Sequence, residues 1–124
     1  MRMKINAWDF SAVELERWAY DSNARFPDQD WELAVAISGN DDLVLKLSQD
    51  ESCPNRDFMV SCLYMIVGDF LHSGSDFPNR ESEIINLAKK ANESKNSKVY
   101  EWSEKTIHIL KNKNEFEYND WCWV

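Results

Sequence analysis

The segment from Pro54 to Ser73 limits what this chain can fold into more than any other, because it is apolar on nearly every side of a helix. One side carries Phe58, Met59, Cys62, Leu63, Ile66 and Phe70, and the other carries Val60, Tyr64, Val67 and Leu71. Ser61, Met65 and Gly68 share one face, where a neighbouring backbone can approach closely. A helix without a polar face must be surrounded by other elements. We therefore predict that this segment lies at the centre of an all-α bundle.

Five further segments have the three- and four-residue spacing of amphipathic helices, which gives about six helices in one domain, 1–124. They cover residues 11–21, 27–38, 41–49, 79–94 and 97–111. Ser11 and Glu14 have the spacing of a capping box, and Pro27 suits a first helical position. The tail, 115–124, has no clear period, and Phe116 and Tyr118 alternate as in a strand. We leave a short strand and an irregular tail as alternatives there.

The composition is that of a small, folded, acidic protein. The chain has 124 residues, with 14 Lys and Arg against 22 Asp and Glu, and a formal net charge of −8. Its six Trp, six Phe and four Tyr are too many for a disordered acidic tail. A protein that grips nucleic acid through phosphates needs a basic face. The charge therefore argues against direct nucleic-acid binding and favours a basic protein partner.

Several features of the sequence indicate a cytoplasmic protein that contacts no membrane. The start, Met1 to Asp9, contains no apolar stretch of the length that a secretory signal needs. Cys53, Cys62 and Cys122 are odd in number and form no CxxC motif, which is typical of a reduced compartment. The longest apolar stretch, which ends at Leu71, is too short and too interrupted to span a bilayer.

Residues with the spacing of a chemical site are few. Asp69 and His72 share a helix face, as do Glu104 and His108, so a metal site between these two helices is geometrically conceivable. Ordinary helix contacts explain the same residues more simply. No glycine-rich phosphate loop occurs, and Cys62 falls on the most apolar face, where it is expected to pack in the core. We therefore expect a protein that is not an enzyme, with no metal and no cofactor.

The acidic residues are concentrated in one part of the chain. Between residues 28 and 57, eight carboxylates stand against two basic residues, Lys46 and Arg56. The carboxylates are Asp28, Asp30, Glu32, Asp41, Asp42, Asp50, Glu51 and Asp57. Most of them fall in a predicted first helical turn, where negative charge offsets the helix dipole. Asp50 and Glu51 instead fall at the end of a helix, where this explanation fails.

Helices joined by short loops pack as antiparallel neighbours, so their ends alternate between two poles of a bundle. Four helix ends should then lie at one pole: the end of helix 11–21, the start of helix 27–38, the end of helix 41–49 and the start of helix 54–73. We predict that this acidic pole binds the partner through Asp21, Asp28, Asp30, Trp31, Asp50, Glu51 and Asp57. Two alternatives stay open: the carboxylates form only a solvated rim, and Trp31 packs in the core. If the pole binds a partner, reversing the charges of Asp50 and Glu51 should slow association and barely change stability.

The stretch 53–70, Cys-Pro-Asn-Arg-Asp-Phe-Met-Val-Ser-Cys-Leu-Tyr-Met-Ile-Val-Gly-Asp-Phe, follows an acidic, Trp-containing helical half. In this arrangement the chain resembles the small helical immunity proteins of bacterial contact-dependent growth inhibition and related polymorphic toxin systems. The resemblance implies a cytosolic protein that binds the C-terminal toxin domain of an inhibition effector, commonly a nuclease such as a tRNase, and blocks it. The alternative is a non-enzymatic helical adaptor or regulatory protein that binds another basic partner.

Overall fold

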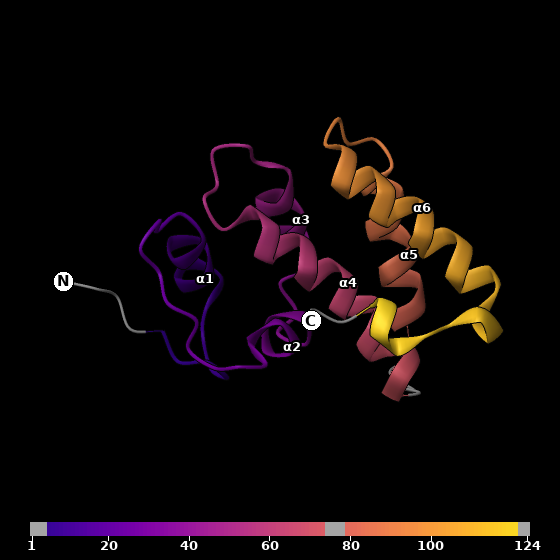
Figure 1. Ribbon diagram of the computed structural model, residues 1–124, viewed down its shortest axis with the longest axis horizontal. Coiled ribbons are helices and arrows are strands. Elements are labelled where there is room, and N and C mark those ends of the chain that lie inside the picture. Colours follow the sequence, from indigo (N-terminus) through magenta and orange to yellow (C-terminus); the bar gives the residue numbers. More distant parts are fainter. Residues whose placement is uncertain (1–4, 74–78, 122–124) are drawn as a thin grey trace.

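The computed structural model describes residues 5–73 and 79–121, which form six α-helices and two short 3₁₀ turns (Figure 1). The helices are α1 (Ala12–Ala19), α2 (Trp31–Ala36), α3 (Asp41–Gln49), α4 (Arg56–Ser73), α5 (Arg80–Ala91) and α6 (Ser97–Lys111). The described ranges contain no strand. The predicted all-α class and the number of helices are therefore confirmed.

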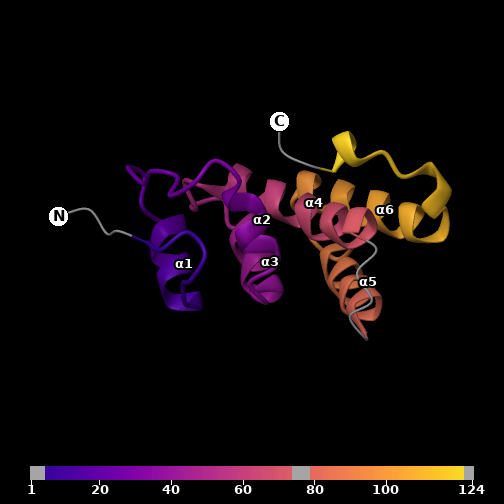
Figure 2. The same cartoon turned by 90° about the horizontal axis from the view of Figure 1, so that it is seen from below.

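Helix α4 lies at the centre of the bundle, as its apolar sequence predicts. Figures 1 and 2 show α1, α2 and α3 on one side of it and α5 with α6 on the other. Leu63, in the middle of α4, is fully buried, and so are Met59 and Val67. None of the helices in the described part of the chain is long and apolar enough to cross a membrane.

The bounds of the helices follow local signals where such signals exist. Helices α3 and α6 begin and end where the sequence predicts. The Asn96 side chain caps α6 by accepting hydrogen bonds from the backbone N–H groups of Lys98 and Val99, at 3.0 and 3.2 Å. The predicted capping box of α1 is also present, since Ser11 and Glu14 bond each other's backbone N–H groups.

Helix α2 is shorter than predicted, because it begins at Trp31 and not at Pro27. The residues before it form turns that are held by distant parts of the chain. The indole Nε1 of Trp18 donates to the carbonyl oxygen of Arg25 at 3.0 Å, and that of Trp8 donates to the Asp28 carboxylate at 3.0 Å. These contacts keep residues 20–30 as a long connection between α1 and α2.

Aromatic rings join this connection to the core. The ring of Trp31 is stacked on that of Phe58, with centroids 5.3 Å apart and planes at 8°. The Trp18 ring makes T-shaped contacts with both, with its centroid 4.5 Å from that of Trp31 and 5.3 Å from that of Phe58. Phe26, from the connection, packs on Phe58 at 5.0 Å. Three elements and one loop thus share a single aromatic cluster, which fixes where α2 begins.

The C-terminal tail is irregular, so the strand alternative is wrong for its described residues. It forms two 3₁₀ turns, Lys113–Glu115 and Tyr118–Asp120, and then packs on α4 through Trp121. A Cβ atom on Gly68 would lie 2.8 Å from the Trp121 carbonyl oxygen. The expected close backbone approach at Gly68 is therefore confirmed. Cys122 lies outside the described residues.

Candidate partner-binding surface

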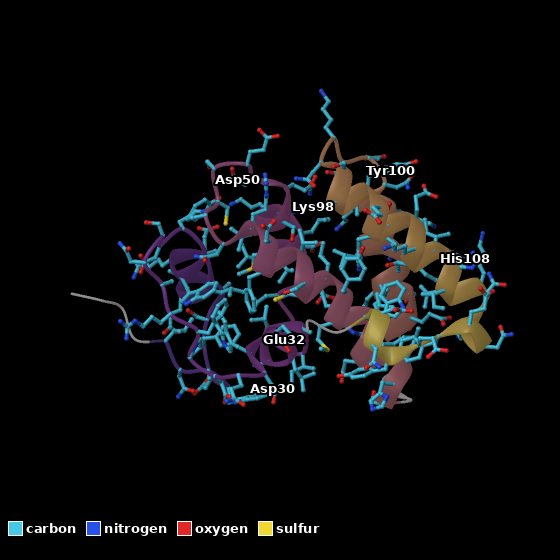
Figure 3. The ribbon with its side chains drawn as sticks, in the orientation of Figure 1. Asp30, Glu32, Asp50, Lys98, Tyr100 and His108 are labelled. Carbon is cyan, nitrogen blue, oxygen red and sulfur yellow. The ribbon has the colours of Figure 1, made fainter. Side chains whose placement is uncertain are left out.

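The predicted acidic pole is divided between two edges of the molecule. Figure 3 shows Asp50 at one edge and Asp30 at the opposite edge. The connection 20–30 is long enough to run from the end of α1 to the far side of the bundle, where α2 begins. Helices α1 and α2 are therefore not antiparallel neighbours. The prediction that the start of α2 lies at the acidic pole is therefore wrong.

At the first edge, the end of α1 and the start of α4 meet through a network of hydrogen bonds. The Asn55 side-chain amide donates to the carbonyl oxygens of Trp18, Ala19 and Asp21, at 3.1, 3.1 and 2.9 Å. The Asp21 carboxylate accepts a hydrogen bond from the Asn23 backbone N–H at 2.9 Å. Asp21 is thus part of the turn that ends α1.

Asp50 has a structural role that the helix-dipole argument left open. Its carboxylate accepts hydrogen bonds from the backbone N–H of Ser52 at 2.9 Å, from the Ser52 hydroxyl at 2.6 Å and from the Tyr20 hydroxyl. The Ser52 and Tyr20 bonds lower the pKa of Asp50 to about 2, and the bond to Asp50 raises the pKa of Tyr20 to about 12. Reversing Asp50 would break this turn, so the expectation of unchanged stability holds only for the exposed Glu51.

Three other carboxylates of the acidic segment pair with bases from the C-terminal helices. Asp41 pairs with Arg80 at 2.5 Å, and both side chains are largely buried. Asp42 pairs with Lys90 at 2.9 Å, and Asp57 pairs with Lys98 at 3.0 Å, both on the surface. Asp57, a predicted partner-binding residue, is therefore neutralised within the chain.

At the second edge, a groove of about 440 Å³ opens beside the start of α2. It is lined by Phe26, Asp28, Gln29, Trp31 and Glu32. Phe26 is half exposed, and Trp8 is also half exposed, with its indole bonded to Asp28. Two accessible aromatic rings therefore lie beside a set of carboxylates, as in many protein-binding surfaces.

Trp31 is buried and cannot serve as a surface anchor, which corrects its inclusion among the partner-binding residues. Its side chain has no exposed area, and its indole donates to the Ala7 carbonyl oxygen at 2.9 Å. The spacing of Trp31 with Ala34 and Val35 places all three on the core face of α2. The alternative that Trp31 belongs to the core is thus confirmed.

The groove contains a carboxylate that the predicted site omitted. Glu32 is only 7% exposed, and no other described residue forms a hydrogen bond or an ion pair with its side chain. Burial, together with the negative charge of Asp30, raises the pKa of Glu32 above its ordinary value. The exposed Asp30 side chain likewise makes no hydrogen bond at the start of α2.

A sequence signal for Glu32 did exist. Glu32 is the one charged residue between Trp31 and Ser38, in a run that is otherwise almost wholly apolar. A charged side chain inside such a run is expected either to find a partner or to serve one. Counting Glu32 only as one of the eight carboxylates of the acidic segment hid this feature.

The residues considered for metal binding or catalysis lie apart from the groove. His72 packs on the Tyr118 ring, with centroids 4.3 Å apart, and His108 lies 3.2 Å from the Glu115 carboxylate. Among residues 5–73 and 79–121, no group of three His, Cys, Asp or Glu side chains could hold a metal ion. Cys53 and Cys62 are buried free thiols, and burial raises the pKa of both.

Comparisons with known protein families, with curated proteins and with solved structures gave no match to this chain.

Proposed function

We propose that this protein is an immunity protein, which binds the C-terminal toxin domain of a contact-dependent growth inhibition effector and blocks it. The likeness of residues 53–70 to such proteins supports this assignment, together with the acidic composition of the chain. The single observation that carries it is the groove beside α2, where the largely buried Glu32 has no cation of the described chain to neutralise it.

The charge and the aromatic residues at this edge suit a basic protein partner. A nuclease toxin, for example one that cuts tRNA, must offer a basic surface to the phosphates of its substrate. Asp28, Asp30 and Glu32 place negative charge at the groove, and opposite charges speed association and suppress wrong partners. The exposed rings of Trp8 and Phe26 offer the apolar contact area that slows dissociation.

This function needs no chemistry from the protein itself. An inhibitor that covers the substrate-binding surface of a nuclease acts by occupying that surface, with carboxylates in the place of phosphates. The same arrangement would also suit a helical adaptor that binds a different basic protein. The identity of the partner therefore separates the two functions.

Co-expression tests the proposal directly. A gene for a large secreted effector immediately upstream of the gene for this chain would identify the probe, which is the C-terminal domain of that effector. We expect the protein to restore growth of cells that express this domain, to form a stable complex with it, and to stop its RNA or DNA cleavage in stoichiometric amounts. Growth inhibition that persists, with no complex on a sizing column, would contradict the proposal. A complex that leaves the nuclease active would favour the adaptor.

A further inference from the structure

Glu32 occupies an unusual position for an acidic side chain. It is only 7% exposed, it lines the groove beside α2, and no cation from the described chain reaches it. The charge of Asp30 lies close enough to raise the pKa of Glu32 further, and the charge of Glu32 in turn raises the pKa of Cys62. Its carboxylate has the backbone N–H of Glu32 itself as a hydrogen-bond donor but no opposite charge to offset the cost of burial, so a cation that enters the groove would neutralise it.

We propose that the groove receives the guanidinium group of an arginine on the partner protein, with Glu32 as its counter-ion. This assignment rests on the proposed function, because it names the chemical group of the toxin domain that the same surface would bind. Arginine fits better than lysine for two reasons. Its planar fork can bond both oxygens of one carboxylate, and it is more weakly hydrated, so it enters a buried site at lower cost.

The walls of the groove support the choice of arginine. The half-exposed ring of Phe26 offers a flat apolar face on which a guanidinium can stack. Gln29 and Asp28 line the opening, but the Asp28 carboxylate is already bonded to the Trp8 indole at 3.0 Å and to the Gln29 backbone N–H at 2.6 Å. Glu32, which lines the groove, and Asp30, which is exposed beside it at the start of α2, are then the carboxylates left for a ligand. Two carboxylates suit one guanidinium and are too few for the oxygen shell of a metal ion.

A small probe tests the groove without any toxin. N-acetylarginine amide is titrated into the full chain, and the indole N–H resonances of Trp8 and Trp31 are followed by NMR. We expect saturable binding in the millimolar range that weakens at least about tenfold in Glu32→Gln. Asp30→Asn should weaken binding less, because Asp30 is exposed.

The matched control is Glu93→Gln. Glu93 is exposed on the C-terminal side of the bundle, and its side chain makes no hydrogen bond or ion pair with another described residue. The substitution removes the same negative charge as Glu32→Gln. Binding in this variant should equal that of the wild type. Three results would overturn the assignment. They are arginine-probe binding in Glu32→Gln as tight as in the wild type, no saturable binding in the wild type, and an affinity for N-acetyllysine amide equal to that for the arginine probe. Melting curves of Glu32→Gln and Asp30→Asn establish that both variants are folded when they are compared.

A second arm uses the toxin domain and separates this inference from the proposed function. If the wild type binds the domain, Glu32→Gln should raise the dissociation rate and weaken affinity by at least about tenfold. A toxin complex that is unaffected by Glu32→Gln would overturn the inference and leave the proposed function standing. Binding of the arginine probe by a protein that does not bind the toxin would overturn the proposed function and leave the groove assignment standing.

Discussion

Glu32 and Asp50 belong to the same acidic segment, yet their surroundings shift their pKa values in opposite directions. Glu32 is buried beside Asp30, and the loss of water raises its pKa. Asp50 is solvated and accepts hydrogen bonds from Ser52 and Tyr20, which lower its pKa to about 2. The first carboxylate therefore destabilises the free protein at neutral pH, whereas the second stabilises it.

The first prediction concerns the stability of the free protein. Glu32→Gln should raise Tm at about pH 7, because it removes a largely buried charge that no cation of the described chain neutralises. With a raised pKa, the folded state holds the Glu32 proton more tightly than the unfolded state, so stability falls as pH rises above the ordinary Glu range. The gain in Tm over the wild type should therefore shrink towards about pH 4. Calorimetry at both pH values, with Glu93→Gln as control, checks this, and a lower Tm at neutral pH would contradict it.

The second prediction concerns Asp50 and Tyr20. A lowered pKa means that Asp50 contributes stability above its ordinary pKa of 3.8, and that this contribution is lost as pH falls towards about 2. Asp50→Asn should therefore lower Tm at neutral pH, and its difference from the wild type should close in acid. Tyr20 behaves in the opposite sense: its contribution is present below pH 10 and is lost as pH rises through about 12.

The control for Asp50→Asn is Glu51→Gln, which removes the same charge one residue away. The Glu51 side chain is exposed and makes none of the bonds that Asp50 makes, so Tm should hardly change in this variant. Equal losses in the two variants would show that net charge, and not the hydrogen bonds of Asp50, stabilises this turn.

At the scale of the elements, the sequence predicts best where the signals are local. The bounds of α3 and α6 follow from nearby caps and periodicity, and the centrality of α4 follows from its apolar surface. The start of α2 could not be predicted this way. Pro27 is a good local signal for a helix, but Trp8 bonds Asp28 from 20 residues away. The spacing of apolar residues does not reveal a contact between residues so distant in sequence. This contact holds Asp28 in the connection before α2, so the helix begins later than Pro27 suggests.

The third prediction concerns the contact between α4 and the tail. In an exposed helix, Gly→Ala stabilises by about 1 kcal/mol. Gly68→Ala should instead destabilise the protein, because the new Cβ would lie 2.8 Å from the Trp121 carbonyl oxygen and displace the tail. Chemical denaturation measures the free energy of unfolding. In a chain that ends at Asn112 the clash is absent, so there the same substitution should become neutral or stabilising. Destabilisation of equal size in both chains would contradict the prediction.

At the scale of the whole molecule, bases of the C-terminal helices neutralise part of the acidic segment 28–57. Arg80, Lys90 and Lys98 from the C-terminal half neutralise Asp41, Asp42 and Asp57. The excess of negative charge could be read from the sequence, but these pairings depend on how α5 and α6 pack beside α3 and α4. Within the acidic segment they leave two exposed carboxylates without a partner among the described residues: Asp30, and Glu51, which follows Asp50 at the opposite edge (Figure 3). The sequence therefore predicts that the surface is acidic. The prediction that its carboxylates gather at one pole is wrong, because they lie at two opposite edges.

The last prediction uses these two residues to find the edge that meets the toxin domain. Asp30→Lys and Glu51→Lys make the same change of charge at positions that are both exposed and both free of bonds that hold the fold. If the toxin binds at the groove, Asp30→Lys should slow association several-fold at low salt, and Glu51→Lys should slow it much less, because electrostatic steering acts mainly near the contact.

The salt dependence completes the test. Steering is screened beyond about 10 Å at 0.1 M salt, so the difference between the two variants should shrink as salt is added, while their dissociation rates stay close to that of the wild type. Rates from surface plasmon resonance at low and high salt, with melting temperatures for each variant, give the answer. A larger effect from Glu51→Lys would place the toxin at the turn between α3 and α4. Equal, small effects from both variants would show that each carboxylate belongs to a solvated rim.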